Sequence, residues 1–307
     1  MESSVKDEHN PARHGDISSY LRGVMAGEKP PAFPMVARRV LQMVQDSDVN
    51  FQRLCDVLSD DAALAARILA VSRSPIYGQR TAPRTLLDAV HVLGLRTLTS
   101  VVVASAAHSL RSKNSRLAEK LWNHSLAVGL MMWILSERVG GHEGEQAFLA
   151  GLLHDIGEMV LMDKDPYGFE NLAREVKHSH GSIIAKEQQI YEYDHALIGV
   201  TMLNSWNLDS KIGVAVLNHH GSFSGADINQ LAALVSVAEH VCDQIGLGFV
   251  GEPLTPAYEL LKQCGCADAA GLEDTIAQLR RAYIEESAIF KLSCASFRSQ
   301  RALRLQF

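Results

Sequence analysis

The chain has 307 residues, of which 47% are hydrophobic and 21% are charged, and its formal net charge is -6. These values are typical of a folded globular protein and exclude a disordered chain, a collagen-like chain and a disulfide-stabilised scaffold. The length predicts two domains or lobes of about 150 residues each. The acidic balance gives no electrostatic reason to expect nucleic acid as a partner.

We interpret the polar residues 1–30 as an extension that is only partly ordered. Beyond Phe33-Pro34, apolar residues recur at the spacing of helices. Gly94 should end one of these helices, and the small residues around Val101-Val102-Val103 favour a buried helix over a strand. The predicted helices of this region cover residues 36–44, 51–58, 61–73, 86–93 and 95–110.

From Leu121 the predicted helices are longer, and the first of them should stop at Gly140-Gly141. The helices cover residues 121–139, 147–161, 182–192, 195–205, 210–219, 228–245, 255–263 and 271–290. We predict an irregular, charged connection over residues 163–181 and a basic tail from Lys291 onward. Helix N-caps are expected at Asp194, Asp209 and Asp227.

The five cysteines show no Cys-x-x-Cys spacing, so we expect free thiols in a reducing cytoplasm. The N-terminal region is polar and shows no signal-peptide pattern, so we expect none. The longest uninterrupted apolar stretch, Leu126 to Leu135, has ten residues and is too short to span a bilayer. We therefore predict a cytoplasmic protein without membrane insertion.

The most informative local feature is His154-Asp155, which interrupts an otherwise apolar helical pattern. Two polar groups in such a place are costly unless they pair with each other or bind a metal. The same region carries further imidazoles and carboxylates on successive predicted helices: His124, His195, His219, His220 and Glu239. Helical bundles build metal sites from inward-facing side chains of this kind, and such donors suit transition metals better than calcium or magnesium.

The order of these residues resembles the HD superfamily of metal-dependent phosphohydrolases, and residues 31–245 more narrowly resemble an HDOD domain. The stretches that carry the resemblance are Phe33-Pro34, Ser59 to Leu69, Ser74 to Gly78, Ala89 to Gly94, Leu121 to His124, Ala150 to Gly157, Asp194 to Trp206 and His219-His220.

This resemblance implies an all-α fold in which a five-helix HD core packs against a smaller N-terminal helical lobe. On this basis residues 1–30 form the polar extension and residues 31–115 the N-terminal lobe. Residues 116–248 form the HD-like lobe with its His/Asp site, and residues 249–307 form C-terminal helices and the basic tail.

The resemblance also implies a ligand set for one or two transition-metal ions, namely Fe, Mn, Zn or Ni. The residues that match ligand positions of the related HD-GYP phosphodiesterases are His124, His154, Asp155, His195, His219 and His220. Glu239 stands where those enzymes have Asp, with Asp243 as the alternative last ligand. Asp155 would bridge two metals, and His154 and Asp155 would be the catalytic pair. We expect His124, His154 and Glu239 on one side and the other three histidines on the opposite side.

The sequence departs from the family pattern at three places, of which the first two weaken an enzyme assignment. Glu158 replaces the Lys that commonly follows the His-Asp motif, and an anion there would repel phosphate. The Gly-Tyr-Pro loop expected after His219-His220 is replaced by Gly221 to Asp227, and Arg73 replaces an Asn. The candidate phosphate-binding cations, which we interpret mainly as surface charges, are Lys164, Lys177, Lys186 and Lys211.

The resemblance therefore predicts a bacterial signalling or regulatory module that binds metal and acts through protein partners. The alternatives are an active phosphohydrolase or phosphodiesterase on a nucleotide or cyclic dinucleotide, and a structural module with an empty site. A phosphate-containing ligand fits the first two readings. The basic tail is either a solvated segment or a docking peptide.

Overall fold

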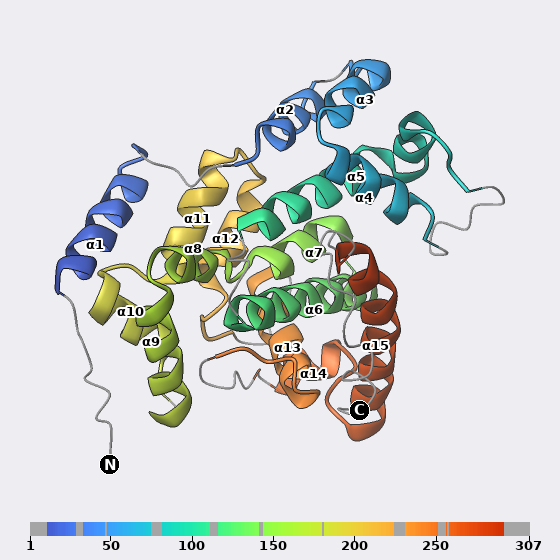
Figure 1. Ribbon diagram of the computed structural model, residues 1–307. Helices are drawn as coiled ribbons and strands as arrows, with labels where there is room; N and C mark the ends of the chain where they lie inside the picture. Colours follow the sequence, from blue (N-terminus) through green and yellow to red (C-terminus); the bar gives the residue numbers. More distant parts are fainter. Residues whose placement is uncertain are drawn as a thin grey trace, which may run out of the picture. The chain divides into compact units, whose positions relative to one another are not determined.

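The computed structural model describes residues 11–28, 33–46, 48–74, 82–110, 116–140, 144–179, 181–223, 231–250, 256 and 258–291. Throughout these residues the regular elements are helices, which confirms the prediction of an all-α fold (Figure 1). The chain divides into two compact units. One comprises Met1–Phe33 and Ala107–Ile276, and the other comprises Pro34–Ala106 and Ala277–Phe307.

The unit that begins at Pro34 contains helices with polar caps. Its elements are α2 (Met35–Val44), α3 (Phe51–Ser59), α4 (Ala62–Ser72) and the first part of α5 (Leu86–Leu110). The side chain of Asn50 accepts a hydrogen bond at the start of α3, and Asp61 does the same at the start of α4. These caps satisfy backbone N–H groups that the helices leave unpaired.

Helix α5 changes direction at Gly94, which has a φ of 69°. A left-handed backbone of this kind favours glycine, as expected for a residue predicted to end a helix. The segment around Val102 is helical and buried, as predicted. By length and composition α5 could cross a membrane, but half of its most apolar window is buried inside the protein. That burial is typical of a core helix.

The other unit holds most of the helices. They are α1 (Pro11–Met25), α6 (Arg116–Val139), α7 (Gly144–Leu153), α8 (Ile156–Lys164), α9 (Pro166–Ser179), α10 (Ile183–Tyr191), α11 (His195–Ser205), α12 (Ser210–Asn218), α13 (Leu231–Gln244), α14 (Tyr258–Gln263) and part of α15 (Ala269–Lys291). Helix α6 packs along α7 and α13, while α11 packs against α8 and α12. This packing brings the segments that carry His124, His154, His195, His219 and His220 into one core.

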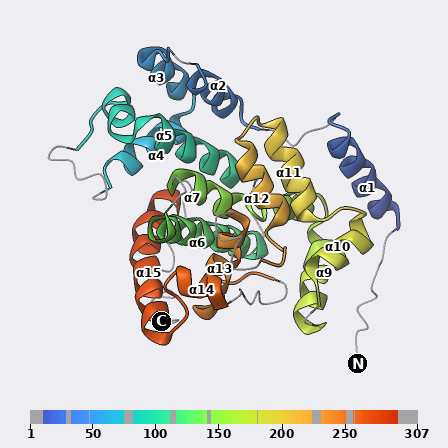
Figure 2. The same ribbon diagram turned by 180° about the vertical axis from the view of Figure 1, so that it is seen from behind.

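Helix α1 corrects the prediction that residues 1–30 form a partly ordered extension. Ile17, Leu21 and Val24 are buried at the spacing of one helical face. Polar neighbours hide this stripe in the sequence. The helix lies beside α10 and α11 in both views (Figures 1 and 2).

Helix α9 corrects the prediction of an irregular connection over residues 163–181. Its buried side chains, Phe169, Leu172, Ala173 and Val176, follow the i, i+3, i+4, i+7 pattern of an amphipathic helix. Charged residues on the opposite face led to the wrong prediction, because they are the solvated side of the same helix.

The single helix predicted over residues 147–161 is also wrong. The chain forms α7 and α8 instead, with His154 and Asp155 in the turn between them. Asp194 and Asp209 cap α11 and α12 as predicted. Asp227 and the tail beyond Lys291 lie outside the described residues.

Candidate metal centre

The structure brings all seven predicted ligands together. His124 comes from α6, Glu239 from α13, and His154-Asp155 from the turn between α7 and α8. His195 is the first residue of α11, and His219-His220 directly follow α12. Two groups result, with donor atoms inside each group within 4.8 Å of one another. The first, the Glu239 half, is His124, His154 and Glu239; the second, the His195 half, is His195, His219 and His220, grouped with Asp155.

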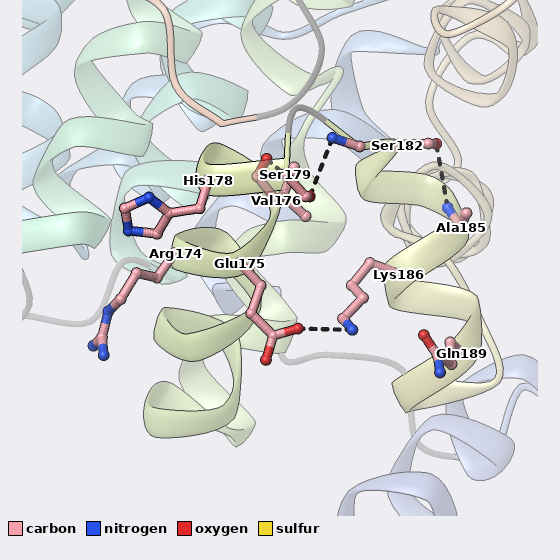
Figure 3. A pocket seen from close by; sticks show the side chains of 10 residues that line it. Arg174, Glu175, Val176, His178, Ser179, Ser182, Ala185, Lys186 and Gln189 are labelled. Carbon is pink, nitrogen blue, oxygen red and sulfur yellow. Dashed lines mark hydrogen bonds and ion pairs between the residues drawn. The ribbon is translucent and has the colours of Figure 1, made fainter.

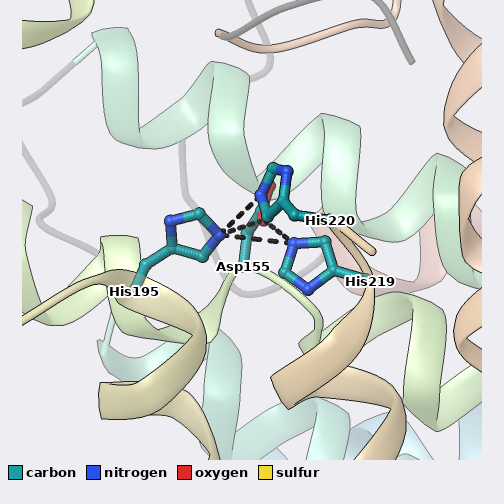
Figure 4. Close-up of side chains that lie close together, drawn as sticks. All are labelled: Asp155, His195, His219 and His220. Carbon is teal, nitrogen blue, oxygen red and sulfur yellow. Dashed lines mark hydrogen bonds and ion pairs between the residues drawn. The ribbon is translucent and has the colours of Figure 1, made fainter. Parts of the chain in front are cut away.

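Asp155 lies between the two halves and turns one oxygen toward each. Its Oδ2 lies 3.0 Å from Nε2 of His154 and 3.5 Å from Nε2 of His124. Its Oδ1 lies 3.5 Å from Nε2 of His195 and 3.4 Å from Nε2 of His219. Figure 4 shows the His195 half converging on this carboxylate. A carboxylate in this position can bridge two cations.

Hydrogen bonds on the outer side of the rings fix which nitrogen faces the centre. Nδ1 of His124, His154 and His219 donates to the backbone carbonyls of Leu247 (2.9 Å), Gly151 (2.7 Å) and Val216 (2.7 Å). A carbonyl oxygen can only accept, so each Nδ1 must carry a proton. The Nε2 atoms therefore face the centre. Hydrogen bonds of this kind form the second layer that is expected around metal-binding histidines.

The inward-facing nitrogens lie so close together that their lone pairs would repel one another if no cation lay between them. Nε2 of His124 lies 3.3 Å from Nε2 of His154, and Nε2 of His195 lies 3.3 Å from Nε2 of His219. His220 adds a contact of 3.1 Å between its Nε2 and that of His195. Each cluster therefore favours a shared cation, which either a proton or a metal ion can supply. The donor set fits a transition metal.

The pKa shifts in the cluster also indicate that the centre favours a cation. Burial alone would raise the pKa of Asp155, but His154 and the other facing imidazoles hold it well below its usual range. Burial opposes charge on His154, yet Asp155 and Glu239 more than offset this and raise its pKa well above the ordinary value. Burial and the neighbouring imidazoles lower the pKa of His220 to about 2. The centre thus keeps an ionised carboxylate among imidazoles that compete for positive charge.

Close backbone packing sets the distance between the two halves. A Cβ at Gly157, in the first turn of α8, would clash with the backbone carbonyl oxygen of His195. Glycine lets α8 approach the start of α11, and Asp194 caps that helix by accepting from Leu197 N at 2.8 Å. The His-Asp turn and His195 are held together as a result.

Glu158 does not face a phosphate site as its place in the sequence suggested. Its side chain is 2% exposed, and its Oε1 lies 3.9 Å from Nδ1 of His195. Burial, together with the charges of Asp155, Glu187 and Glu239, raises its pKa well above the usual value. Because the carboxyl is buried on the Nδ1 side of His195, opposite the Nε2 that faces the centre, Glu158 is not an exposed anion at the place where a phosphate would approach.

The remaining predicted residues lie apart from the two halves. Asp243 is one turn beyond Glu239 on α13 but belongs to neither donor group. Lys164 pairs with Asp163 at 3.0 Å, and Lys186 pairs with Glu175 at 2.7 Å. Figure 3 shows this second pair in a surface cleft of about 640 Å³ between α9 and α10. Lys177 and Lys211 are exposed on α9 and α12.

One residue of the centre was not predicted. Glu187 on α10 is fully buried and accepts from Nδ1 of His195 at 2.7 Å. It shares a buried face with Ile183 and Tyr191, four residues on either side. An acidic residue within that apolar stripe is the sequence signal that could have revealed it.

Comparisons with known proteins identify the family and the fold of the chain. The family model described as "HDOD domain" matches residues 31–222. An HDOD domain protein of unknown function from Geobacter sulfurreducens is 21% identical, with a TM-score of 0.65, 92% of this chain covered and 99% of that one. A candidate phosphohydrolase from Shewanella amazonensis SB2B is 23% identical, with a TM-score of 0.67 and coverages of 88% and 97%. At these identities the structures show a shared fold.

A further structure, a candidate signal transduction protein from Marinobacter aquaeolei VT8, is 18% identical with a TM-score of 0.68 and coverages of 91% and 66%. Among curated proteins, an uncharacterised protein of Treponema pallidum (strain Nichols) is 22% identical over 191 residues. That match spans 62% of this chain but only 37% of the relative. Because the family model covers more than half of the sequence, the chain belongs to the HDOD domain family.

Proposed function

We propose that this protein is a regulatory HDOD module built around a two-metal centre, and that it acts through protein partners. The observation that carries the proposal is the division of the donors into two halves that share Asp155. Burying seven polar donors costs free energy, and a purely structural module would gain nothing from that cost. The resemblance to a candidate signal transduction protein supports the regulatory role.

The donor chemistry narrows the metals. Imidazole nitrogens and carboxylate oxygens suit Fe, Mn, Zn and Ni, and the described residues of the two halves include no thiolate. His124, His154 and Glu239 would hold one ion, and His195, His219 and His220 the other. When bound, such a pair supplies Lewis acidity toward a phosphoryl group and lowers the pKa of a nearby water.

Elemental analysis of the full chain, purified anaerobically, tests the proposal. We expect two transition-metal ions per chain, and none after exchange into a strong chelator. A chain that contains no transition metal, and that takes up none of Fe, Mn, Zn or Ni on titration, would contradict the proposal and favour a purely structural module.

A metal-dependent phosphohydrolase is the second candidate, and the placement of Glu158 favours it. Because that carboxyl is buried and faces His195 and Glu187, it does not bar a phosphate from the centre. His154 and Asp155 would then orient the metals against the substrate. Turnover of a panel of phosphodiesters and nucleotides with added Mn²⁺ or Fe²⁺ decides the matter. Metal binding without turnover supports the regulatory module, and turnover lost in Asp155→Asn supports the enzyme.

A further inference from the structure

We infer that Glu187 is the positioning residue of the His195 half: it holds the ring of His195 so that Nε2 faces Asp155. This inference rests on the proposed metal-binding function. It concerns a side chain one layer behind the ligands, contributed by α10, which carries none of the seven donors.

One carboxylate oxygen of Glu187 makes two contacts with the same residue. Its Oε2 accepts from the backbone N–H of His195 at 2.9 Å and from the ring Nδ1 at 2.7 Å. Two bonds to a single oxygen fix both the start of α11 and the plane of the imidazole ring. Both residues are fully buried, so water does not compete for these bonds.

The backbone contact satisfies an N–H group that the helix leaves unpaired. His195 is the first residue of α11, and its N–H has no partner within the helix. The N-cap residue, Asp194, uses its side chain on Leu197 N instead. Glu187 therefore completes the cap from a neighbouring helix and ties that cap to the ligand.

His195 differs in this respect from the other oriented histidines. Nδ1 of His124, His154 and His219 donates to backbone carbonyls, which any sequence would provide. The ring of His195 alone among these four is held by a side chain. A carboxylate partner also makes the imidazole a more basic ligand than a carbonyl does, so the His195 half should depend on Glu187.

Glu158 provides a matched control for charge. It is as deeply buried as Glu187, but its Oε1 is 3.9 Å from Nδ1 of His195, beyond hydrogen-bonding distance. Gln188 provides a control for disturbance of α10, because its side chain donates to Asp194 Oδ2 at 2.7 Å and does not reach His195. Neither substitution removes the bond that the inference requires.

The first measurement uses full-length, metal-free protein labelled with ¹⁵N-histidine. NMR should show the Nδ1 proton of His195 as a strongly downfield, slowly exchanging signal, assigned by its loss in His195→Asn. We expect that signal to disappear in Glu187→Ala and to persist in Glu158→Gln and Gln188→Ala. Its persistence in Glu187→Ala would overturn the inference. This readout needs no metal, so it remains decisive even where the wild-type chain binds none and the proposed function fails.

The second measurement is calorimetric titration of the same variants with Mn²⁺. Glu187→Ala should bind one ion as the wild type does and a second about 10–100-fold more weakly, the typical cost of losing an outer-layer partner. Unchanged affinity for both ions, or an equal loss for both, would overturn the positioning role. Where Glu187→Ala does not fold, Glu187→Gln replaces it, since an amide oxygen can accept both bonds. In Glu187→Gln the Nδ1 proton signal of His195 should persist at a less downfield shift, and the affinity for the second ion should fall by less than in Glu187→Ala. A variant with the same chemical shift and the same affinities as the wild type would count against the inference.

Discussion

The two halves of the centre use the same kinds of side chain in different places. The Glu239 half places a carboxylate among its donors, beside two imidazoles that are oriented by backbone carbonyls. The His195 half has three imidazoles, and its carboxylate, Glu187, lies one layer behind. Besides the shared Asp155, the Glu239 half thus has a carboxylate among its donors, whereas the His195 half has one that is hydrogen-bonded behind His195, with Glu158 at 3.9 Å from the same ring nitrogen.

This difference suggests how each half tolerates change. In the Glu239 half the carboxylate would contact the metal directly, so its loss removes a ligand. In the His195 half the carboxylate acts on the metal only through His195, so its loss weakens the site without emptying it. Among the seven described donors, Asp155 alone turns one oxygen toward each half.

Asp155→Asn should impair both halves at once, because it removes the charge that they share. We expect the metal content to fall from two ions to none after dialysis, a larger loss than the roughly 100-fold cost of an outer-layer change. Elemental analysis measures this, with Asp163→Asn as a control on an exposed carboxylate of α8. Two retained ions in Asp155→Asn would contradict the bridging role.

Glu239→Gln should affect one half only. An amide is a poorer ligand than a carboxylate, so we expect one ion per chain to remain, bound by the His195 half. The matched control is Asp243→Asn, one turn later on α13, which should keep both ions. The reverse result would identify Asp243 as the ligand and would overturn the assignment of Glu239.

Gly157→Ala should push the halves apart without replacing a donor side chain. The new methyl group would meet the backbone carbonyl of His195, which cannot rotate away. We expect a loss of about 3 kcal/mol in the free energy of unfolding, at the upper end for overpacking. Urea denaturation measures it, with Gly213→Ala as control, because the added methyl there would meet side chains, those of Val200 and Asn204, and no backbone atom outside its own helix within 4 Å. Equal stability of the two variants would show that the approach of α8 to α11 is not tight.

The smallest expected effect is a pH dependence of the free energy of unfolding, which would come from His195. Burial lowers its pKa, but Glu187 more than offsets this and raises it to about 9 in the metal-free protein. A raised pKa means that the folded state holds the proton more tightly than the unfolded chain does. The stabilisation is therefore complete below about pH 6.5 and is lost as the pH rises through 9.

Between pH 7 and pH 8 this group should contribute a loss of about 1 kcal/mol. Chemical denaturation of chelator-treated protein at both pH values measures the change, and His195→Asn should show a shallower dependence. An equally steep dependence in the variant would mean that His195 is not the titrating group.

Much of the fold was predictable because buried helices show their spacing in the sequence. The helices around Val102 and from Leu121 onward are apolar enough to stand out, and the caps at Asp194 and Asp209 follow from local chemistry. Two of the failures have a common cause. In α1 and α9 the buried stripe is narrow and surrounded by polar residues, so the average composition resembles a loop. The break between α7 and α8 was missed for another reason, because the residues on both sides of it are apolar.

The seven donors were predictable because imidazole and carboxylate groups are rare in apolar helices and here follow a family order. Their division into two halves around Asp155 was predicted from the family resemblance, and the fold shows the packing that brings His195 of α11 to Asp155. Glu187 was missed because the tertiary contact with His195, eight residues away, gives it its role. The burial of Glu158 was missed for the same reason, since a sequence does not show which way a carboxyl faces.

The most direct test of the two-half centre is anomalous diffraction from crystals of the full chain loaded anaerobically with Mn²⁺. The division of donors predicts two anomalous peaks, one between Asp155 and the Glu239 half and one between Asp155 and the His195 half. No peak at Asp155, or a single peak that contacts only one of its oxygens, would contradict a centre shared between the two halves.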